Sequence, residues 1–171
     1  MAIVKKVHGL KDVDHEDTIL RSFILFVQAA DTIMKYANTH FYRKERLSVI
    51  KFIVLRLLAA NGGTMIPSQI AEWTFKERHN ITTLIDRMKR DGLVRVERNI
   101  KDKRFVSVSL TAKGRRVLKQ AMPVAREIVN RVMLSISEGN TIPLERSLRV
   151  LRQNAHDGLE HLAKCAQPQP D

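Results

Sequence analysis

A run of hydrogen-bonding and cationic side chains lies between residues 78 and 90, on a segment whose apolar residues have helical spacing. The positions i, i+3, i+4 and i+7 are filled by Ile81, Leu84, Ile85 and Met88, which form one apolar face. The side chains away from that face are of the types that bond base edges and phosphates in nucleic acid: Arg78, His79, Asn80, Thr82, Thr83 and Arg87.

These six residues divide by their place on the helix. Arg78 and His79 lie near its start, where free backbone N–H groups favour phosphate. We expect the remaining four to enter a major groove: Asn80, Thr82, Thr83 and Arg87. The alternative is a solvated helix face, on which Asp86 pairs with Arg90 at i, i+4.

A second candidate surface is the segment from Arg98 to Arg104, which carries four cations and one carboxylate. It separates two runs in which apolar and polar residues alternate, Val94 to Glu97 and Phe105 to Leu110. Because period two is typical of strands, the segment is predicted to be the tip of a two-stranded hairpin. An exposed tip of this charge suits phosphates or a narrow minor groove.

The elements around the helix have their own signals. Gly92 is predicted to end it, because the residue after a helix commonly adopts a left-handed backbone that costs glycine nothing, and Leu93 then packs back on Met88. Residues 67 to 73 are predicted to form a short helix beginning with proline, and Thr74 to cap the next one. Trp73 is expected to pack between these helices rather than to contact a ligand.

The ordered set of short motifs resembles the winged helix-turn-helix of the multiple-antibiotic-resistance regulators, the MarR family. The motifs are Asp91-Gly92-Leu93-Val94, Asp102-Lys103-Arg104 and Leu110-Thr111-Ala112-Lys113-Gly114. The resemblance covers residues 18 to 162 and is strongest from 47 to 114. It implies a mainly α fold with a small β-hairpin wing, DNA binding by a dimer, and a small-molecule effector bound between the dimer helices and the reading module.

The resemblance also assigns roles in the wing. Arg104 is carried over as the minor-groove contact, with Asp102 holding its guanidinium, since carboxylate and guanidinium pair in a fixed fork. Lys101 and Lys103 are expected to contact phosphates. The alternative is a solvated salt bridge in a mobile hairpin.

Charge is segregated along the chain. The net charge is +12, and residues 43 to 119 hold 19 Lys and Arg against 7 Asp and Glu, whereas the remaining residues hold 11 of each. A merely solvated surface predicts no such segregation, so the basic segment indicates a nucleic-acid partner.

Long apolar helices are predicted on both sides of the basic segment, at 18–38, 47–60, 111–135 and 143–163. Thr111 is expected to cap the third of these, Pro123 to kink it, and residues 137–143 to form a turn. The third helix has an apolar stripe formed by Val117, Leu118, Met122, Ala125, Ile128, Val129, Val132 and Met133. The last helix is expected to bury Leu144, Leu148, Leu151, Ala155, Leu159 and Leu162. The first is apolar over more than one face, which favours a second subunit over a monomer core. The expected organisation is a flexible lead-in at 1–17, a helical dimerisation region at 18–46 and 115–163, and a disordered tail at 164–171. Residues 47–114 are expected to form the winged helix-turn-helix DNA-binding domain, called the reading domain or reading module below.

Several classes of chemistry have no support in the sequence. There is no nucleophile-elbow or phosphate-loop motif, and the six histidines show no metal-binding spacing, so neither an enzyme nor a metal or cofactor site is expected. The single cysteine, Cys165, is expected to be inert and suits a reducing cytoplasm. The most apolar run, Ile19 to Ala30, is too short for a membrane span.

The sequence therefore predicts a cytoplasmic, homodimeric and sequence-specific DNA-binding transcriptional regulator, a repressor relieved by a small molecule. Two other interpretations remain open: a sequence-blind DNA-binding module, and a winged-helix module that binds an acidic protein. An effector pocket is suggested by a group of apolar side chains that serve equally well as plain core: Phe23, Phe26, Met34, Phe41 and Phe52.

Overall fold

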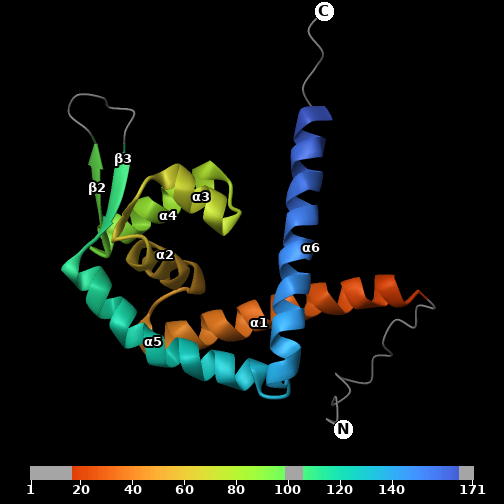
Figure 1. Ribbon diagram of the computed structural model, residues 1–171. Helices are drawn as coiled ribbons and strands as arrows, with labels where there is room; N and C mark the ends of the chain where they lie inside the picture. The colour runs from red at the N-terminus through yellow and green to blue at the C-terminus, as the bar shows by residue number, and fades with distance from the viewer. Residues whose placement is uncertain (1–16, 99–105, 166–171) are drawn as a thin grey trace, which may run out of the picture. The chain divides into compact units, whose positions relative to one another are not determined.

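The computed structural model describes residues 17–98 and 106–165. Within these ranges the chain forms six helices and a three-stranded antiparallel sheet (Figure 1), which confirms the mainly α class with a β wing. In chain order the elements are α1 (Thr18–Glu45), α2 (Val49–Ala60), β1 (Thr64–Met65), α3 (Pro67–Thr74), α4 (Arg78–Arg90), β2 (Val94–Arg98), β3 (Val106–Leu110), α5 (Ala112–Met133) and α6 (Glu138–Cys165).

By internal contacts the chain divides into two compact units, residues 1–132 and residues 133–171. The first contains the sheet and the helices from α1 to α5, and the second contains α6. The predicted N-terminal lead-in up to residue 16 and the tail beyond Cys165 lie outside the described residues.

The sheet has the strand order β1-β3-β2. In the hairpin, Val94 lies opposite Leu110 and Val96 lies opposite Val108, so the predicted alternation of apolar and polar residues is confirmed. The short strand β1 was not predicted. It pairs Thr64 with Ser109, whose hydroxyl oxygens are 2.9 Å apart, because the two residues after Gly63 run along the free edge of β3.

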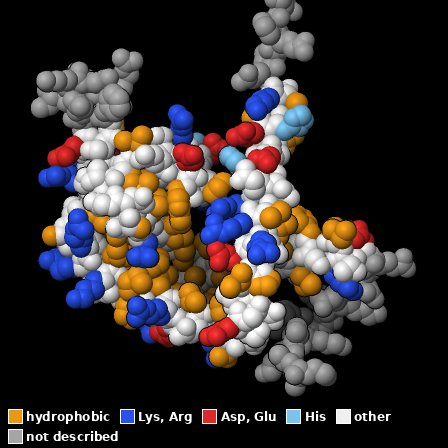
Figure 2. Space-filling model, viewed as in Figure 1, with side chains coloured by type: hydrophobic (Ala, Val, Ile, Leu, Met, Phe, Trp, Pro, Cys, Tyr) orange, Lys and Arg blue, Asp and Glu red, His pale blue; other side chains and the backbone are white. Residues whose placement is uncertain are grey.

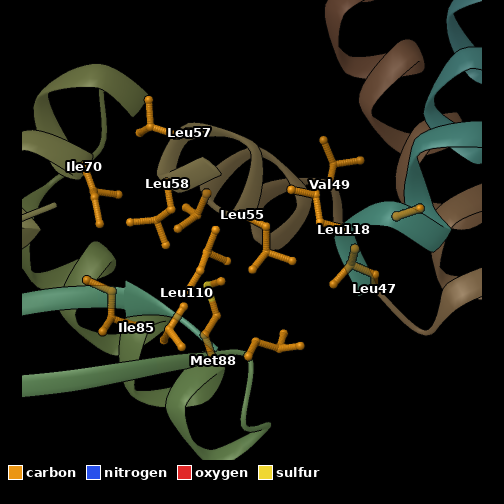
Figure 3. Packing of buried hydrophobic residues seen from close by; sticks show 14 of the residues in the cluster. Leu47, Val49, Leu55, Leu57, Leu58, Ile70, Ile85, Met88, Leu110 and Leu118 are labelled. Carbon is orange, nitrogen blue, oxygen red and sulfur yellow. The ribbon is translucent and has the colours of Figure 1, made fainter. Parts of the chain in front are cut away.

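The core lies among α2, α3, α4 and β3 (Figure 3). Its largest fully buried side chains are Val54, Leu55, Leu58, Ile70, Ile81, Met88 and Val108. Burying an aliphatic side chain of this size contributes roughly 1.5–3 kcal/mol to stability. The segment predicted to be the reading domain therefore holds the centre of the apolar core.

The junction from α4 through the hairpin to α5 is built on two glycines. Gly92 has a φ of +71°, and the N–H groups of Gly92 and Leu93 donate to the carbonyls of Lys89 and Met88, both at 2.9 Å. This pattern closes a helix with a left-handed residue, as predicted. A Cβ on Gly114 would overlap the carbonyl oxygen of Leu93, so α5 can begin here only with glycine at this position.

Thr111 completes the same junction. Its hydroxyl donates to the Gly92 carbonyl at 2.7 Å, with the Leu93 carbonyl 3.1 Å away, and accepts from the Gly114 N–H at 2.9 Å. It therefore caps the first turn of α5, as predicted, and also ties that turn to the end of α4.

The first helix is longer than predicted. It begins at Thr18, where the Asp17 carboxylate accepts from the N–H groups of Ile19 and Leu20, and it ends at Glu45 instead of Asn38. The side chain of Asn38 donates to the Met34 carbonyl and accepts from the Val49 N–H, so it joins α1 to the start of α2 without stopping the helix.

The end of α1 is attached to α2 and α5. The rings of Phe41 and Phe52 pack with centroids 4.8 Å apart. Lys44 Nζ lies 2.7 Å from a carboxylate oxygen of Glu127 on α5, and His40 Nε2 lies 3.2 Å from the other. The bond from Lys44, and after it His40, holds the pKa of Glu127 below its ordinary value.

Helix α5 continues through Pro123 to Met133 and curves along its length (Figure 1), as expected for an internal proline. Most of its predicted apolar face is confirmed, since Leu118 and Ile128 are buried and Val117, Met122, Ala125 and Val132 pack against the core. Val129 is exposed instead, and Ala121 and Val124 are buried although they were not predicted to be. The predicted turn at 137–143 is wrong. Helix α6 already begins at Glu138, because the Ser137 carbonyl accepts from the Asn140 N–H and closes the first turn before Pro143 is reached.

Large apolar side chains are exposed on both terminal helices (Figure 2). No residue of α6 is buried, although its leucines were predicted to be core; among them Leu148, Leu151, Leu159 and Leu162 are exposed. The first half of α1 exposes another set: Ile19, Leu20, Phe23, Leu25, Phe26 and Val27. In one chain these side chains lack the apolar partners that their periodicity calls for.

We expect the substitution Gly114→Ala to lower the free energy of unfolding by about 1–3 kcal/mol, because the new methyl group must displace the Leu93 carbonyl or α5. Urea denaturation followed by circular dichroism, at one fixed protein concentration, measures the loss.

Gly139→Ala is the matched control. A Cβ on Gly139, in the first turn of α6, meets no atom within 4 Å, so this variant should be no less stable than the wild type. Equal stability of the two variants would show that the junction does not require glycine.

Candidate nucleic-acid interface

Helix α4 presents two different faces. Ile81, Ile85 and Met88 are buried in the core and Leu84 is partly buried, as their spacing predicted. The residues predicted to bind nucleic acid are all exposed on this helix: Arg78, His79, Asn80, Thr82, Thr83 and Arg87. Since the core holds one face of the helix, the other is free to enter a groove of suitable width.

The beginning of α4 differs from the prediction. Thr74 does not cap it, because Thr74 is the last residue of α3 and its hydroxyl donates to the Ile70 carbonyl at 2.7 Å. The residue before α4 is Glu77, whose side chain makes no capping hydrogen bond. The first N–H groups of α4 are therefore not occupied by a side-chain cap, which suits a phosphate at this helix end.

The turn before α4 contains a strained residue. Phe75 has a φ of +51°, and the N–H groups of Phe75 and Lys76 donate to the carbonyls of Glu72 and Ala71. The same hydrogen-bond pattern ends α4 at Gly92. At the end of α3 the left-handed position is occupied by phenylalanine, which is strained in this conformation, whereas glycine would not be. The left-handed backbone at Phe75 sets the direction in which α4 leaves α3.

Both threonines of the exposed face are oriented by the helix itself. The Thr82 hydroxyl donates to the Arg78 carbonyl and the Thr83 hydroxyl donates to the His79 carbonyl, each at 3.0 Å. Because the hydroxyl protons are used in this way, these side chains present lone pairs outward. They can accept hydrogen bonds from base amino groups, whereas Asn80 and Arg87 can donate.

The end of α4 is held by two lysines from other helices. Lys51 Nζ on α2 lies 2.6 Å from Oδ2 of Asp91, and Lys113 Nζ on α5 donates to the Asp91 carbonyl at 2.7 Å. Neither contact was predicted from the sequence, because the two partners lie 22 and 40 residues apart. The residues next to Lys51 in α2 are apolar. A cation among apolar residues is a local indication that it has an ionic partner.

The wing is described only in part. Its base is the β2–β3 ladder, in which Arg95 Nε pairs with Glu97 Oε1 at 3.1 Å. The predicted tip residues Lys101, Asp102, Lys103 and Arg104 lie outside the described residues.

Basic side chains lie along one border of the part of the molecule that carries α4 and the hairpin (Figure 2). Figure 2 shows Lys and Arg along the border where Figure 1 places β2, β3 and the start of α5. The last turn of α4 alone carries Arg87, Lys89 and Arg90. This distribution gives the surface the charge that a phosphate backbone attracts.

The prediction for Trp73 is wrong, and the side chains suggested for an effector pocket are divided between core and surface. Trp73 is 56% exposed, so it does not pack between the helices: it faces outward on α3, while Ile70 and Ala71 take the buried face. The proposed effector group is divided, because Phe41 and Phe52 pack in the core whereas Phe23, Phe26 and Met34 are exposed. An open hollow at the end of α1 has a different lining: Asn38, Thr39, Tyr42, Arg43 and Ser48.

Other chemistry has little basis in the part of the chain that is described. It contains no group of three or more His, Cys, Asp or Glu side chains placed to hold a metal ion. Cys165 is exposed, with its sulfur 3.7 Å from His161 Nε2 on the same helix. No described helix combines the length and the apolar content needed to cross a membrane.

Comparison with known proteins gives consistent matches. Residues 47–104 match the sequence model of the MarR family. The transcriptional repressor YetL of Bacillus subtilis is 31% identical over 106 residues, which cover 61% of this chain and 64% of YetL. The transcriptional repressor IacR of Pseudomonas putida is 31% identical over 112 residues, 66% of each chain. The alignments thus span slightly less than two thirds of the length of each relative.

Solved structures share the fold over most of the chain. The organohalide-sensing regulator RdhR-CbdbA1625, bound to 2,4-dichlorophenol, has a TM-score of 0.74 at 21% identity, covering 90% of this chain and 89% of that one. The MarR family regulator Sco3205 of Streptomyces coelicolor, in complex with DNA, has a TM-score of 0.74 at 18% identity, covering 84% and 92%. With the matched segment and the 31% identity to two transcriptional repressors, the chain belongs to the MarR family of transcriptional regulators.

Proposed function

We propose that the protein is a homodimeric, sequence-specific DNA-binding transcriptional regulator that acts in the cytoplasm as a repressor, as YetL and IacR are named. The observation that carries the proposal is the division of α4 into a buried apolar face and an exposed face of hydrogen-bonding residues. Transcriptional regulators are not an enzyme class, and the proposed activity is binding without turnover.

In this proposal α4 enters the major groove. Arg78, His79 and the uncapped N–H groups at the helix start meet the phosphate backbone, which sets the register of the helix on the duplex. The base edges are read by Asn80, Thr82, Thr83 and Arg87. An amide suits adenine and a guanidinium suits guanine, while outward hydroxyl lone pairs accept from exocyclic amino groups.

The wing extends this contact to the flanking minor groove. Arg104 is inserted there, Asp102 orients it, and Lys101 and Lys103 meet phosphates on either side. The antiparallel ladder supports this role, since the pairing of Arg98 with Val106 continues the hairpin up to the edge of the described residues. A narrow minor groove has an enhanced negative potential that attracts arginine.

The terminal helices supply the dimer. The exposed apolar residues of α1 and of α6 each require a partner surface, and a second copy of the chain offers the same residues in return. We assign residues 18–46 and 115–163 to dimerisation and residues 47–114 to reading. A dimer places two reading helices on half-sites about 34–36 Å apart along one side of the duplex.

A small-molecule effector is the remaining part of the proposal. Two solved structures of the same fold support it: RdhR-CbdbA1625 with 2,4-dichlorophenol bound, and BpsR of Bordetella bronchiseptica, whose DNA binding is regulated by 6-hydroxynicotinic acid. The hollow at the end of α1 offers the Tyr42 and Arg43 side chains for such a ligand.

Two rival functions use the same basic surface: sequence-blind DNA binding and binding of an acidic protein. A labelled duplex from the DNA beside the gene, titrated with the protein in excess random-sequence competitor, separates sequence-specific from sequence-blind DNA binding. We expect the complex to survive at least a thousandfold excess of competitor, since specific binding is typically about 10³–10⁷ tighter than non-specific binding. Loss of the complex at equimolar random DNA would favour sequence-blind DNA binding.

The base-reading role of α4 is tested by Asn80→Ala and Arg87→Ala. Each should weaken binding to the preferred duplex by about 1–3 kcal/mol and leave binding to random DNA changed much less. Fluorescence anisotropy at a fixed salt concentration measures both affinities.

Arg56→Ala is the matched control for Arg87→Ala, because it removes an exposed cation from α2 of the same unit. If the two arginine variants lose the same affinity for both duplexes, Arg87 acts only through its charge and is not a base contact.

The wing contact is tested by Arg104→Ala and Arg104→Lys. Both should weaken binding to the preferred duplex, the alanine variant by about 1–3 kcal/mol, because lysine keeps the charge but not the planar fork. Replacing the A·T pairs flanking each half-site by G·C should remove the difference between wild type and variant. An unchanged affinity in both variants would exclude Arg104 from the interface.

A further inference from the structure

We propose that Lys51 is a positioning residue for sequence discrimination, which acts by fixing the C-terminal end of the reading helix through Asp91. The inference rests on the proposed function of α4 in reading DNA. Lys51 itself lies on α2 and is not placed in contact with the duplex.

Asp91 is the residue at which three elements meet. It directly follows α4, its carboxylate binds Lys51 of α2 at 2.6 Å, and its backbone carbonyl accepts from Lys113 of α5 at 2.7 Å. The next carbonyl, that of Gly92, accepts from the Thr111 hydroxyl at 2.7 Å. The last residues of the reading module are thus tied to α2 on one side and to the start of α5 on the other.

Polar contacts to other helices hold the C-terminal end of α4, at Asp91. At its beginning Glu77 makes no side-chain cap, so the buried apolar residues and the Asp91 contacts together determine the angle of the helix. A helix of this length is about 20 Å long. A pivot of about 5° at the Asp91 end would move Arg78 by about 1.5–2 Å, which exceeds the whole distance range of a hydrogen bond.

The Lys51–Asp91 pair differs from an ordinary surface pair. Its side chains are 22% and 47% exposed, and it joins residues 40 positions apart. The Lys35–Asp31 pair has nearly the same length, 2.8 Å, but is 77% and 65% exposed and joins neighbouring turns of one helix. An exposed pair within one helix, such as Lys35–Asp31, contributes little to stability. The Lys51–Asp91 pair instead fixes α2 relative to the end of α4.

The test uses two variants whose charge changes are opposite, Lys51→Met and Asp91→Asn. The readout is the discrimination ratio, defined as Kd for random duplex divided by Kd for the preferred duplex. If the pair positions α4, both variants should lower this ratio by about fivefold or more, comparable to the loss of one base-pair contact. If Lys51 only attracts DNA, Lys51→Met weakens binding to both duplexes equally and Asp91→Asn strengthens it, with the ratio unchanged.

The exchange variant Lys51→Asp with Asp91→Lys should recover part of the lost discrimination, and Lys51→Arg should keep most of it. The controls are Arg56→Met and Glu72→Gln, which remove the same charges from exposed positions of α2 and α3 and should leave the ratio unchanged. All measurements are made at least 15 °C below the melting transition of the least stable variant, so that unfolding does not contribute.

The outcomes separate this inference from the proposed function. A wild-type protein that shows no preferred duplex overturns the proposed function. A wild-type protein that discriminates, with Lys51→Met and Asp91→Asn discriminating equally well, overturns the positioning role alone. Loss of discrimination in both variants, with recovery in the exchange variant, supports it.

Discussion

Among the described glycines, Gly114 comes closest to another part of the backbone, the carbonyl of Leu93, and the arrangement of the proposed reading module depends on this approach. A side chain at position 114 would overlap that oxygen. Because α5 can start this close to the end of α4, one threonine hydroxyl reaches both segments, accepting from Gly114 and donating to Gly92. The residues just before β2 and just after β3, Gly92 and Thr111, are joined by a hydrogen bond at the base of the hairpin. The reading helix, the wing and the first turn of α5 therefore form one connected structure.

This connection explains how a short helix can present a fixed polar face. Helix α4 is anchored by Ile81, Ile85 and Met88 on one side and by the contacts of Asp91 at its end. Its remaining surface needs no protein partner, and its exposed residues are the kinds that bond nucleic acid. The terminal helices have the opposite property, since they expose apolar residues that do need a partner. A dimer bound to a duplex satisfies both requirements.

Much of the reading module could be predicted because its signals are local. Gly92 follows the last apolar residues of a helix by four positions, and Val94 and Val96 alternate with polar residues, so the stop and the hairpin follow from spacing alone. The cap at Thr111 has the same basis. Contacts between distant segments left no such pattern: Asn38 was taken as a helix end because its bond to Val49 cannot be seen in sequence, and Lys51 has its partner 40 residues away.

Other predictions were wrong because the sequence does not show which face of a helix meets its neighbour or which faces a second subunit covers. Trp73 was assigned to the core because an aromatic residue at helical spacing usually is, but the left-handed turn at Phe75 decides which face of α3 meets α4. The leucines of α6 have the spacing of a buried helix face but are exposed in one chain. Periodicity indicates that a helix face needs an apolar partner, but it does not tell whether the partner belongs to the same chain or to another. Strand β1 has two residues, too few to show alternation.

We expect two copies of the exposed α4 face to contact bases on one side of a duplex. This can be measured by selecting duplexes from a random-sequence library with the purified protein and sequencing them. If both copies bind in this way, the selected duplexes are enriched in an inverted repeat whose half-site centres lie about one helical turn, 10–10.5 base pairs, apart or a multiple of it. Recovered duplexes with the base composition of the starting library, at every round, would contradict this expectation.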